Sequence, residues 1–556
     1  MTVNLIISLS MHPTKQKICT LLHPHITKKL SPEMGIHYVY FWINCSHQNI
    51  RRYHMAIVTV SENCTGCKAC IKTCPQMILA LGKNKKMYVA DHDRCMSCYG
   101  CEDVCESNAV FNKKAPLPNM KEDEIQTEQN QTIEPEYDVI IVGAGPAGLG
   151  AAISCAREGL NTAVFERLPN RNVSHHADGG ILFSFPGATT MKKTEGFLEF
   201  PEIEFKLKDD FIHSKMEWLT ADGPDGYCFD DTFKKGMTGY VASKDALVHQ
   251  LADEAQNSGA HLFYNTKVKD FIYDDGKIVG GILLDGTNVH SKVVVTADGI
   301  LANLSEKAKI PVNKNAQGYV QYQTFVFEKP QGLKSGYSFV MGDLKLDEDF
   351  PPAVAGIGIA NNVEMSLVLY SNTKYYSLKK PMDHYLKVFI ESDSRVKKYF
   401  GNNPDSLKFI TQKGTRLRVR DLCKDNAVDG AVAIGDTWVA GAQLGNINSL
   451  ANGIYAGKEL KKAFDRNDFS KESLNNVSHF INKDIETAVN QVAKMMMYPI
   501  TMDAETLTKY FEIFRPLNYP TFFYGNNMQI GLMMMGFMAK NFFKILKNPK
   551  MFQYMK

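Results

Sequence analysis

Eight of the chain's 13 cysteines are crowded into residues 64–105, in two blocks of identical spacing. In each block two residues separate the first three cysteines, and a fourth follows after three more. Two-residue gaps let three thiolates converge on one metal centre from a single tight loop, while the fourth points elsewhere. The blocks are Cys64, Cys67, Cys70 and Cys74, and then Cys95, Cys98, Cys101 and Cys105. This spacing predicts two [4Fe–4S] clusters.

Zinc sites also use four cysteines, so the blocks have a second interpretation. Structural zinc modules usually separate their cysteine pairs widely, whereas here four cysteines lie within eleven residues, twice. The crowding favours clusters. Five further cysteines stand alone, and we expect each to be a small buried apolar residue. They are Cys19, Cys45, Cys155, Cys228 and Cys423.

Residues 55–112 resemble bacterial-type two-cluster ferredoxins. The resemblance implies that each fourth cysteine crosses to the other cluster. One cluster would be held by Cys64, Cys67, Cys70 and Cys105, and the other by Cys95, Cys98, Cys101 and Cys74. The second block ends in Cys105-Glu106 where that family usually has proline, which leaves all eight ligands in place.

A glycine-rich turn follows the apolar strand predicted over residues 137–142 (YDVIIV) and opens an alanine-rich helix. In such a turn the first glycine allows the bend, the second admits a pyrophosphate, and the third lets helix and strand pack closely. The diphosphate would lie against unpaired N–H groups at the helix N-terminus. Glu166, at the end of the next strand, is placed to accept hydrogen bonds from ribose. The turn reads Gly143, Ala144, Gly145, Pro146, Ala147, Gly148.

Two later strands each end in an aspartate beside a glycine. Residues 292–299 (KVVVTADG) end in Asp298-Gly299, and residues 431–436 (AVAIGD) end in Gly435-Asp436. Singly, such a pair is usually only a turn. In this order after the glycine-rich turn, both resemble motifs of FAD proteins of the glutathione-reductase and hydroxylase-like superfamily. That resemblance implies FAD, with Asp436 bonding its ribityl chain.

Within that superfamily, residues 137–465 look most like the geranylgeranyl reductase group. They also resemble its relatives, the electron-transfer-flavoprotein:quinone oxidoreductases and the Fix-type flavoproteins. Besides the motifs above, the resemblance rests on Asn172-Val173, Asp178-Gly179-Gly180, Gly239-Tyr240-Val241 with Lys244, and residues 435–460. Lys244 stands where an arginine is common, and it too is expected at the cofactor. Trp438 replaces a small residue of the relatives, which predicts an indole near the flavin.

The resemblance implies an FAD-dependent oxidoreductase that passes electrons from the clusters to FAD and on to a hydrophobic substrate. Reduction of isoprenoid C=C bonds is the first hypothesis, with catalytic residues unassigned. Tyr240, His175 and His176 are candidate proton donors, although each histidine is more simply a polar surface residue. Electron transfer to membrane quinone is the alternative, and a scaffold subunit of a larger electron-transfer complex is a third. Because only one dinucleotide motif is present, an external ferredoxin or other low-potential carrier is the expected donor.

The elements that position these residues predict an α/β protein with five segments. A poorly patterned stretch (1–54) precedes the ferredoxin module (55–112), a polar linker (113–136), the FAD and substrate region (137–465) and a helical C-terminal region (466–556). We expect the native chain to begin at Met55. Predicted strands over 162–166, 277–284 and 292–297 and a helix over 246–258 alternate in the manner of a parallel sheet, with an antiparallel substrate sheet inserted.

Composition is that of an ordinary globular protein, with 44% hydrophobic residues and a net charge of +3. So small a surplus argues against a nucleic-acid-binding protein. The cysteine pattern favours a reducing cytosol. Residues 528–546 combine methionines with Lys540 and Lys544 at helical spacing, which predicts either peripheral contact with the cytoplasmic membrane face or a core helix.

Overall fold

The computed structural model describes most of the chain from residue 57 onward. The described residues are 57–74, 76–92, 95, 99–113, 132–168, 181–183, 191–223, 228–231, 239–300, 302–311, 316–341, 344, 350, 353–371, 378–400, 407–420, 422–439, 445–482, 485–486, 502, 504–514 and 527–550. The N-terminal stretch, most of the linker, Cys98, His175 and His176 lie outside these residues.

Residues 57–113 form a small module around the cysteines. Strands β1 (Ile57–Val60) and β4 (Val110–Lys113) pair antiparallel, and β2 (Leu79–Leu81) forms a hairpin with β3 (Met87–Val89). Two short helices, α2 (Ala69–Thr73) and α3 (Gly100–Asp103), carry the later cysteines of the blocks. Its few apolar side chains pack against the cysteines themselves. So small an apolar core is typical of modules that depend on metal for stability.

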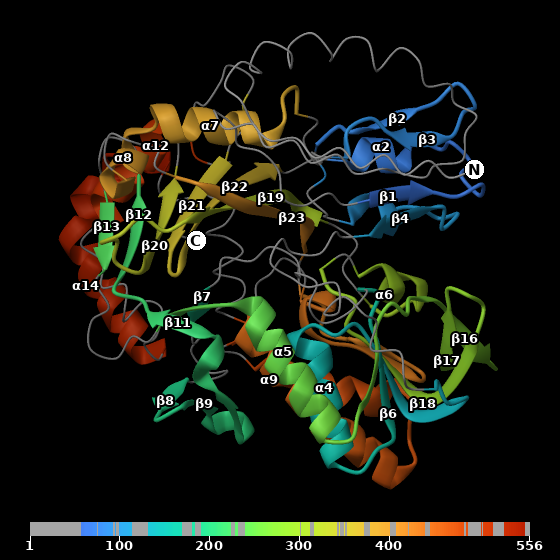
Figure 1. Ribbon diagram of the computed structural model, residues 1–556. Helices are drawn as coiled ribbons and strands as arrows, with labels where there is room; N and C mark the ends of the chain where they lie inside the picture. Colours follow the sequence, from blue (N-terminus) through green and yellow to red (C-terminus); the bar gives the residue numbers. More distant parts are fainter. Residues whose placement is uncertain are drawn as a thin grey trace, which may run out of the picture. The chain divides into compact units, whose positions relative to one another are not determined.

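The predicted FAD and substrate region (137–465), called the FAD-binding region from here on, is built on an eight-stranded sheet. Strands β15 (His261–Phe263), β6 (Thr162–Phe165), β5 (Glu136–Val142), β18 (Asn288–Thr296) and β25 (Ala431–Ala433) run parallel, as expected. Residues 139–142 of β5 are buried on both faces, which explains their unbroken apolar run. Helices α4 (Pro146–Arg157), α5 (Lys244–Asn257) and α9 (Gly445–Arg466) lie side by side (Figure 1).

The strand predicted over 277–284 departs from the parallel pattern. It forms β17 (Lys277–Leu283), which pairs antiparallel with both β16 (Val268–Asp274) and β18. Short turns join these three strands, and a short turn connects only antiparallel neighbours.

Helices α4 and α9 approach so closely that side chains are excluded where they cross. A Cβ on Gly453 would lie 2.1 Å from the carbonyl oxygen of Ala147, and one on Gly150 would lie 2.6 Å from that of Leu450. The helix after the first glycine turn and the helix after the last acidic motif are thereby held together. The two predicted cofactor motifs consequently share one end of the sheet.

A second sheet of seven strands is inserted in the FAD-binding region, as predicted. Its order is β13 (Cys228–Asp231), β12 (Trp218–Asp222), β20 (Gly336–Met341), β21 (Ala353–Ile359), β22 (Asn362–Ser371), β19 (Ala316–Glu328) and β23 (Phe409–Arg420). All neighbours are antiparallel except β12 and β20. Apolar side chains from α7 (Met382–Ser392) complete its core.

The C-terminal region is helical, as predicted. Helix α14 (Asn527–Leu546) packs on α12 (Ala504–Phe514), with the rings of Phe537 and Phe514 5.1 Å apart. Among the described residues, no helix has the length and apolar character needed to cross a bilayer.

Candidate cofactor sites

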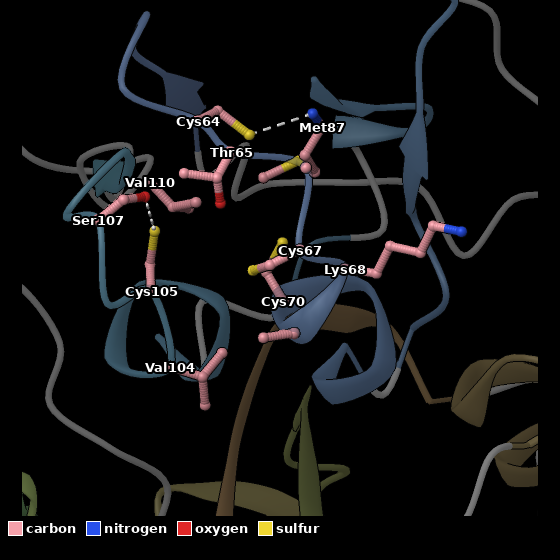
Figure 2. Close-up of a pocket in the computed structure, with 12 residues that line it drawn as sticks. Cys64, Thr65, Cys67, Lys68, Cys70, Met87, Val104, Cys105, Ser107 and Val110 are labelled. Atoms are coloured by element: carbon pink, nitrogen blue, oxygen red, sulfur yellow. Dashed lines mark hydrogen bonds between the residues drawn. The ribbon is translucent and has the colours of Figure 1, made fainter. Parts of the chain in front are cut away.

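Four thiols from both cysteine blocks surround one cavity of the small module. The thiols that line the cavity are those of Cys64, Cys67, Cys70 and Cys105 (Figure 2). Three come from the first block and one from the end of the second. This grouping is the crossed arrangement that the ferredoxin resemblance implies, although their ligation of a cluster stays a prediction.

Backbone and hydroxyl groups contact the sulfur atoms of this cavity. Met87 N donates to Cys64 Sγ at 3.4 Å, and Ala109 N donates to Cys105 Sγ at 3.2 Å. The Ser107 hydroxyl lies 3.5 Å from Cys105 Sγ (Figure 2). Hydrogen bonds to sulfur stabilise a reduced cluster because they offset its added negative charge.

The four thiols around the cavity lie close enough to influence one another electrostatically. Burial raises the pKa of the Cys70 thiol, and the neighbouring thiols of Cys105, Cys67 and Cys64 add to that rise. Among the described residues, no three His, Cys, Asp or Glu side chains gather closely enough to hold a single metal ion. The four thiols line one cavity, which is the arrangement that the predicted cluster requires.

The second predicted site is described in part. Cys95 and Cys101 are buried and Cys74 is partly buried, all three within the module's core, while Cys98 lies outside the described residues. Of the five single cysteines, Cys155 is fully buried, as expected, and burial raises its pKa to about 12. Cys423 is only partly buried.

The glycine-rich turn has the geometry that its motif predicts. Gly143 has φ +105°, and a Cβ on Gly148 would lie 1.9 Å from the Gly143 carbonyl oxygen, so neither position tolerates a side chain. Gly145, in contrast, has open space where its Cβ would be. It directly precedes α4, whose first residue is Pro146 and whose N-terminus has no side-chain cap. An anion meets unpaired N–H groups there.

Glu166 lies beside this turn and is 8% exposed. Its Oε2 accepts from Ala144 N at 2.7 Å, and its Oε1 accepts from Leu168 N at 2.9 Å. The carboxylate is therefore fixed at the edge of the turn by backbone amides. Each oxygen keeps a further acceptor site, as ribose binding requires.

The two aspartates of the later motifs differ in their surroundings. Asp298 Oδ2 accepts from Leu304 N at 2.8 Å and holds the start of α6 (Asn303–Lys307). Gly299, with φ +79°, donates its N–H to Thr437 Oγ1 at 2.8 Å, which ties the two motifs together. The contacts of Asp298 show a structural role, and its predicted role in cofactor binding stays a prediction.

Asp436 has a buried side-chain oxygen that finds no hydrogen-bond partner among the described residues. Burial raises the pKa of this carboxyl to about 6, and the charge of Lys244, at the start of α5, opposes the rise. A buried acceptor that lacks a partner is costly unless a ligand donates to it. A sugar-like hydroxyl chain supplies such donors. The site therefore fits the predicted FAD, because Asp436 offers an acceptor that a ligand can use and Gly145 leaves open space at the turn.

Other predicted residues lie in the core of the FAD-binding region. Tyr240, in β14 (Gly239–Ala242), is buried, and burial raises its pKa. Trp438 is 3% exposed and donates its indole N–H to the Cys423 carbonyl at 2.9 Å. Its predicted closeness to the flavin stays a prediction.

Three residues that tie the small module to the FAD-binding region have no sequence signal. Gln76, Tyr99 and Glu102 contact residues more than 65 positions away, and nothing in their local pattern marks them. Only their position beside cysteines of the second site singles them out.

Comparison with protein families matches both regions. A 4Fe-4S dicluster domain matches residues 63–110, and an FAD binding domain matches residues 138–197. A digeranylgeranylglycerophospholipid reductase of Picrophilus torridus is 24% identical over 398 residues, covering 68% of this chain and 92% of its own. The protein FixC of Salmonella typhi is 25% identical over 350 residues, covering 61% and 79%.

A solved structure shares the fold. It is a geranylgeranyl bacteriochlorophyll reductase-like protein of Thermoplasma acidophilum, with a TM-score of 0.59 and 19% identity over 75% of this chain and 98% of its own. The chain thus joins a 4Fe–4S dicluster domain to an FAD-binding oxidoreductase fold, and its cofactors are FAD and [4Fe–4S] clusters.

Proposed function

We propose that this FAD- and iron–sulfur-dependent oxidoreductase reduces C=C bonds of an isoprenoid lipid with electrons received through its cluster module. The observation that carries the proposal is the similarity to the Picrophilus torridus reductase, which spans 92% of that protein. The similarity also extends over 68% of this chain, far more than either matched cofactor domain alone.

When bound, FAD supplies two-electron chemistry and the clusters supply single electrons. The protein's own residues supply binding and position. The glycine turn and the first N–H groups of α4 would receive the diphosphate, Glu166 the ribose, and Asp436 the hydroxyl chain. Burial raises the pKa of Asp436 to about 6, and the positive charge of Lys244 offsets part of that rise, which favours the ionised acceptor.

The two clusters would be held by the crossed sets of four cysteines. Around the first set, the N–H groups of Met87 and Ala109 would stabilise the reduced form. The donor to this module would be an external ferredoxin or another low-potential carrier.

A lipid substrate also suits helix α14. Its outward side exposes large apolar side chains, among them Met528 (75%), Leu532 (61%) and Phe543 (77%), next to the exposed Lys540 and Lys544. A helix face of this kind binds the surface of an anionic bilayer, and each lysine near the surface contributes about 1 kcal/mol to the binding free energy. We propose peripheral membrane contact there. Leu532→Asp/Phe543→Asp would abolish flotation with anionic vesicles, whereas Tyr273→Asp, at another exposed ring, would not.

The similarity to FixC supports one alternative, electron transfer to membrane quinone. Both are tested by offering anaerobically reduced protein a digeranylgeranyl phospholipid in one experiment and a short-chain quinone in another. We expect flavin reoxidation with the lipid, together with a mass gain of two hydrogens per reduced bond. Protein stripped of FAD is the control. Rapid reoxidation of the flavin by quinone, without any mass gain on the lipid, would show that the protein transfers electrons to quinone and does not reduce the lipid.

A further inference from the structure

Residues close in sequence to cysteines of the predicted second site contact the FAD-binding region. Tyr99 lies between Cys98 and Cys101 in sequence, is 4% exposed, and packs on Leu168. The guanidinium of Arg167 lies 4.6 Å from the centre of its ring. Leu168 and Arg167 directly follow Glu166. The second cysteine block therefore touches the segment that carries the ribose-side acid.

Two further contacts also involve residues close in sequence to such cysteines. Lys267 Nζ donates to Glu102 Oε1 at 3.1 Å, and Glu102 directly follows Cys101. Gln76 Nε2 donates to Gln323 Oε1 at 2.8 Å in strand β19, and Gln76 lies two residues after Cys74. Each of these contacts involves a residue that lies within two positions of a cysteine predicted for the second cluster.

The first cysteine site is open to solvent instead. Cys67 and Lys68 are exposed, and the Lys68 side chain points away from the thiols (Figure 2). The tip of the β2–β3 hairpin packs on this loop, because a Cβ on Gly66 would lie only 2.1 Å from the Lys85 carbonyl oxygen. Lys83 and Lys85, both exposed, are thereby held beside the first site.

Charge is divided between the two halves of the module. Residues 57–92 contain five lysines and two acidic residues, one of which, Glu62, pairs with Lys86. Residues 93–113 contain four acidic residues and two basic ones. The acidic half meets Lys267 and Arg167 of the FAD-binding region. The basic half leaves four exposed lysines around the first site: Lys68, Lys72, Lys83 and Lys85.

We infer that the module has a fixed polarity: a small acidic electron-carrier protein docks on these four lysines and reduces the cluster at Cys67, and the second cluster passes the electron to the FAD-binding region. Each step moves one electron from donor to acceptor without a proton or a bond change. The inference rests on the proposed function for the direction of flow. The docking surface itself follows from exposure and charge.

The test follows reduction of the clusters by a prereduced, acidic two-[4Fe–4S] ferredoxin, with lipid and quinone left out. In stopped-flow absorbance at low salt, Lys68→Glu/Lys85→Glu should slow cluster reduction at least about tenfold and flatten its dependence on salt, because rim charges set association rates. The matched control is Lys334→Glu/Lys408→Glu, which reverses two exposed lysines just before strands β20 and β23 and should leave the rate unchanged. Dithionite should reduce all three proteins equally.

A second readout does not depend on rates. Carbodiimide cross-links between the ferredoxin and this protein should map to the four lysines. Cross-links elsewhere, or an unchanged rate in Lys68→Glu/Lys85→Glu, would overturn the docking surface. Because no lipid is present, failure of lipid reduction would leave both results standing, so the two proposals fail separately.

Discussion

Lys68 and Tyr99 occupy the same position in the two cysteine blocks, directly after the second cysteine. Both have left-handed backbones, with φ of +67° and +58°, and both precede a short helix. Lys68 is exposed, whereas Tyr99 is buried against Arg167 and Leu168. Identical spacing thus produces the same local backbone, at about 1–2 kcal/mol of strain each. The side chain at that position sets which block meets solvent and which meets the FAD-binding region.

The largest test of this difference removes one ligand from each site. Cys67→Ala and Cys101→Ala should each lose one cluster, lowering iron from about eight to about four atoms per chain. Only Cys101→Ala should also release Tyr99 and Glu102, seen as faster hydrogen exchange at Leu168. Equal exchange at Leu168 in the two variants would contradict the polarity of the module.

The equivalent pair of side chains is the next test. Tyr99→Ala should destabilise the holoprotein by about 2–4 kcal/mol, because a large buried ring is lost. Lys68→Ala should change the unfolding free energy by less than about 0.5 kcal/mol, as for most surface sites. Urea titrations of both variants measure these values. Similar losses in both would show that the two blocks are equally buried.

The ion pairs of the two halves provide a smaller contrast. The side chains of Glu102 and Lys267 are 10% and 23% exposed, so a double-mutant cycle should find a coupling of about 1 kcal/mol. Glu62 is 95% exposed in its pair with Lys86, and that cycle should find no measurable coupling. A stronger coupling in the exposed pair would reverse the expected order.

The smallest effect concerns pH. Burial raises the pKa of the Tyr99 hydroxyl, so the folded protein keeps its proton where the unfolded chain would lose it. Its contribution to stability is therefore constant below pH 10 and falls progressively above it. Phenylalanine cannot ionise, so in Tyr99→Phe the free energy of unfolding, measured by urea titration, should fall less above pH 10. If this free energy fell with pH as steeply in Tyr99→Phe as in the unmodified protein, the assigned role of the Tyr99 hydroxyl would be wrong.

Sequence predicts best the motifs whose conformation is determined by residues close by in the chain. The turn requires glycine at 143 because φ there is +105°, and at 148 because a Cβ would meet the Gly143 carbonyl oxygen within the same turn. The strands over residues 137–142 and 162–166 and the helix over 246–258 were predictable for the same reason. Their apolar pattern and flanking residues are local.

The antiparallel placement of β17 and the roles of the two aspartates needed the fold. Asp298 and Asp436 look alike in sequence, each beside a glycine at a strand end. Asp298 accepts a hydrogen bond at the start of α6, whereas one oxygen of Asp436 is buried and has no hydrogen-bond partner in the part of the chain that the structure describes. The helices packed around each strand end decide that difference, and no local pattern encodes it.

Sequence alone determined the two cysteine blocks, the dinucleotide turn and the order of the regions, because ligand spacing and backbone conformation are properties of short segments. The ferredoxin resemblance already implied that Cys105 joins the first block, and the fold brings it to that cavity. Only the tertiary structure decided that Tyr99, Glu102 and Gln76 connect the module to the FAD-binding region. Those contacts join residues far apart in the chain, so packing and charge across the folded molecule select them.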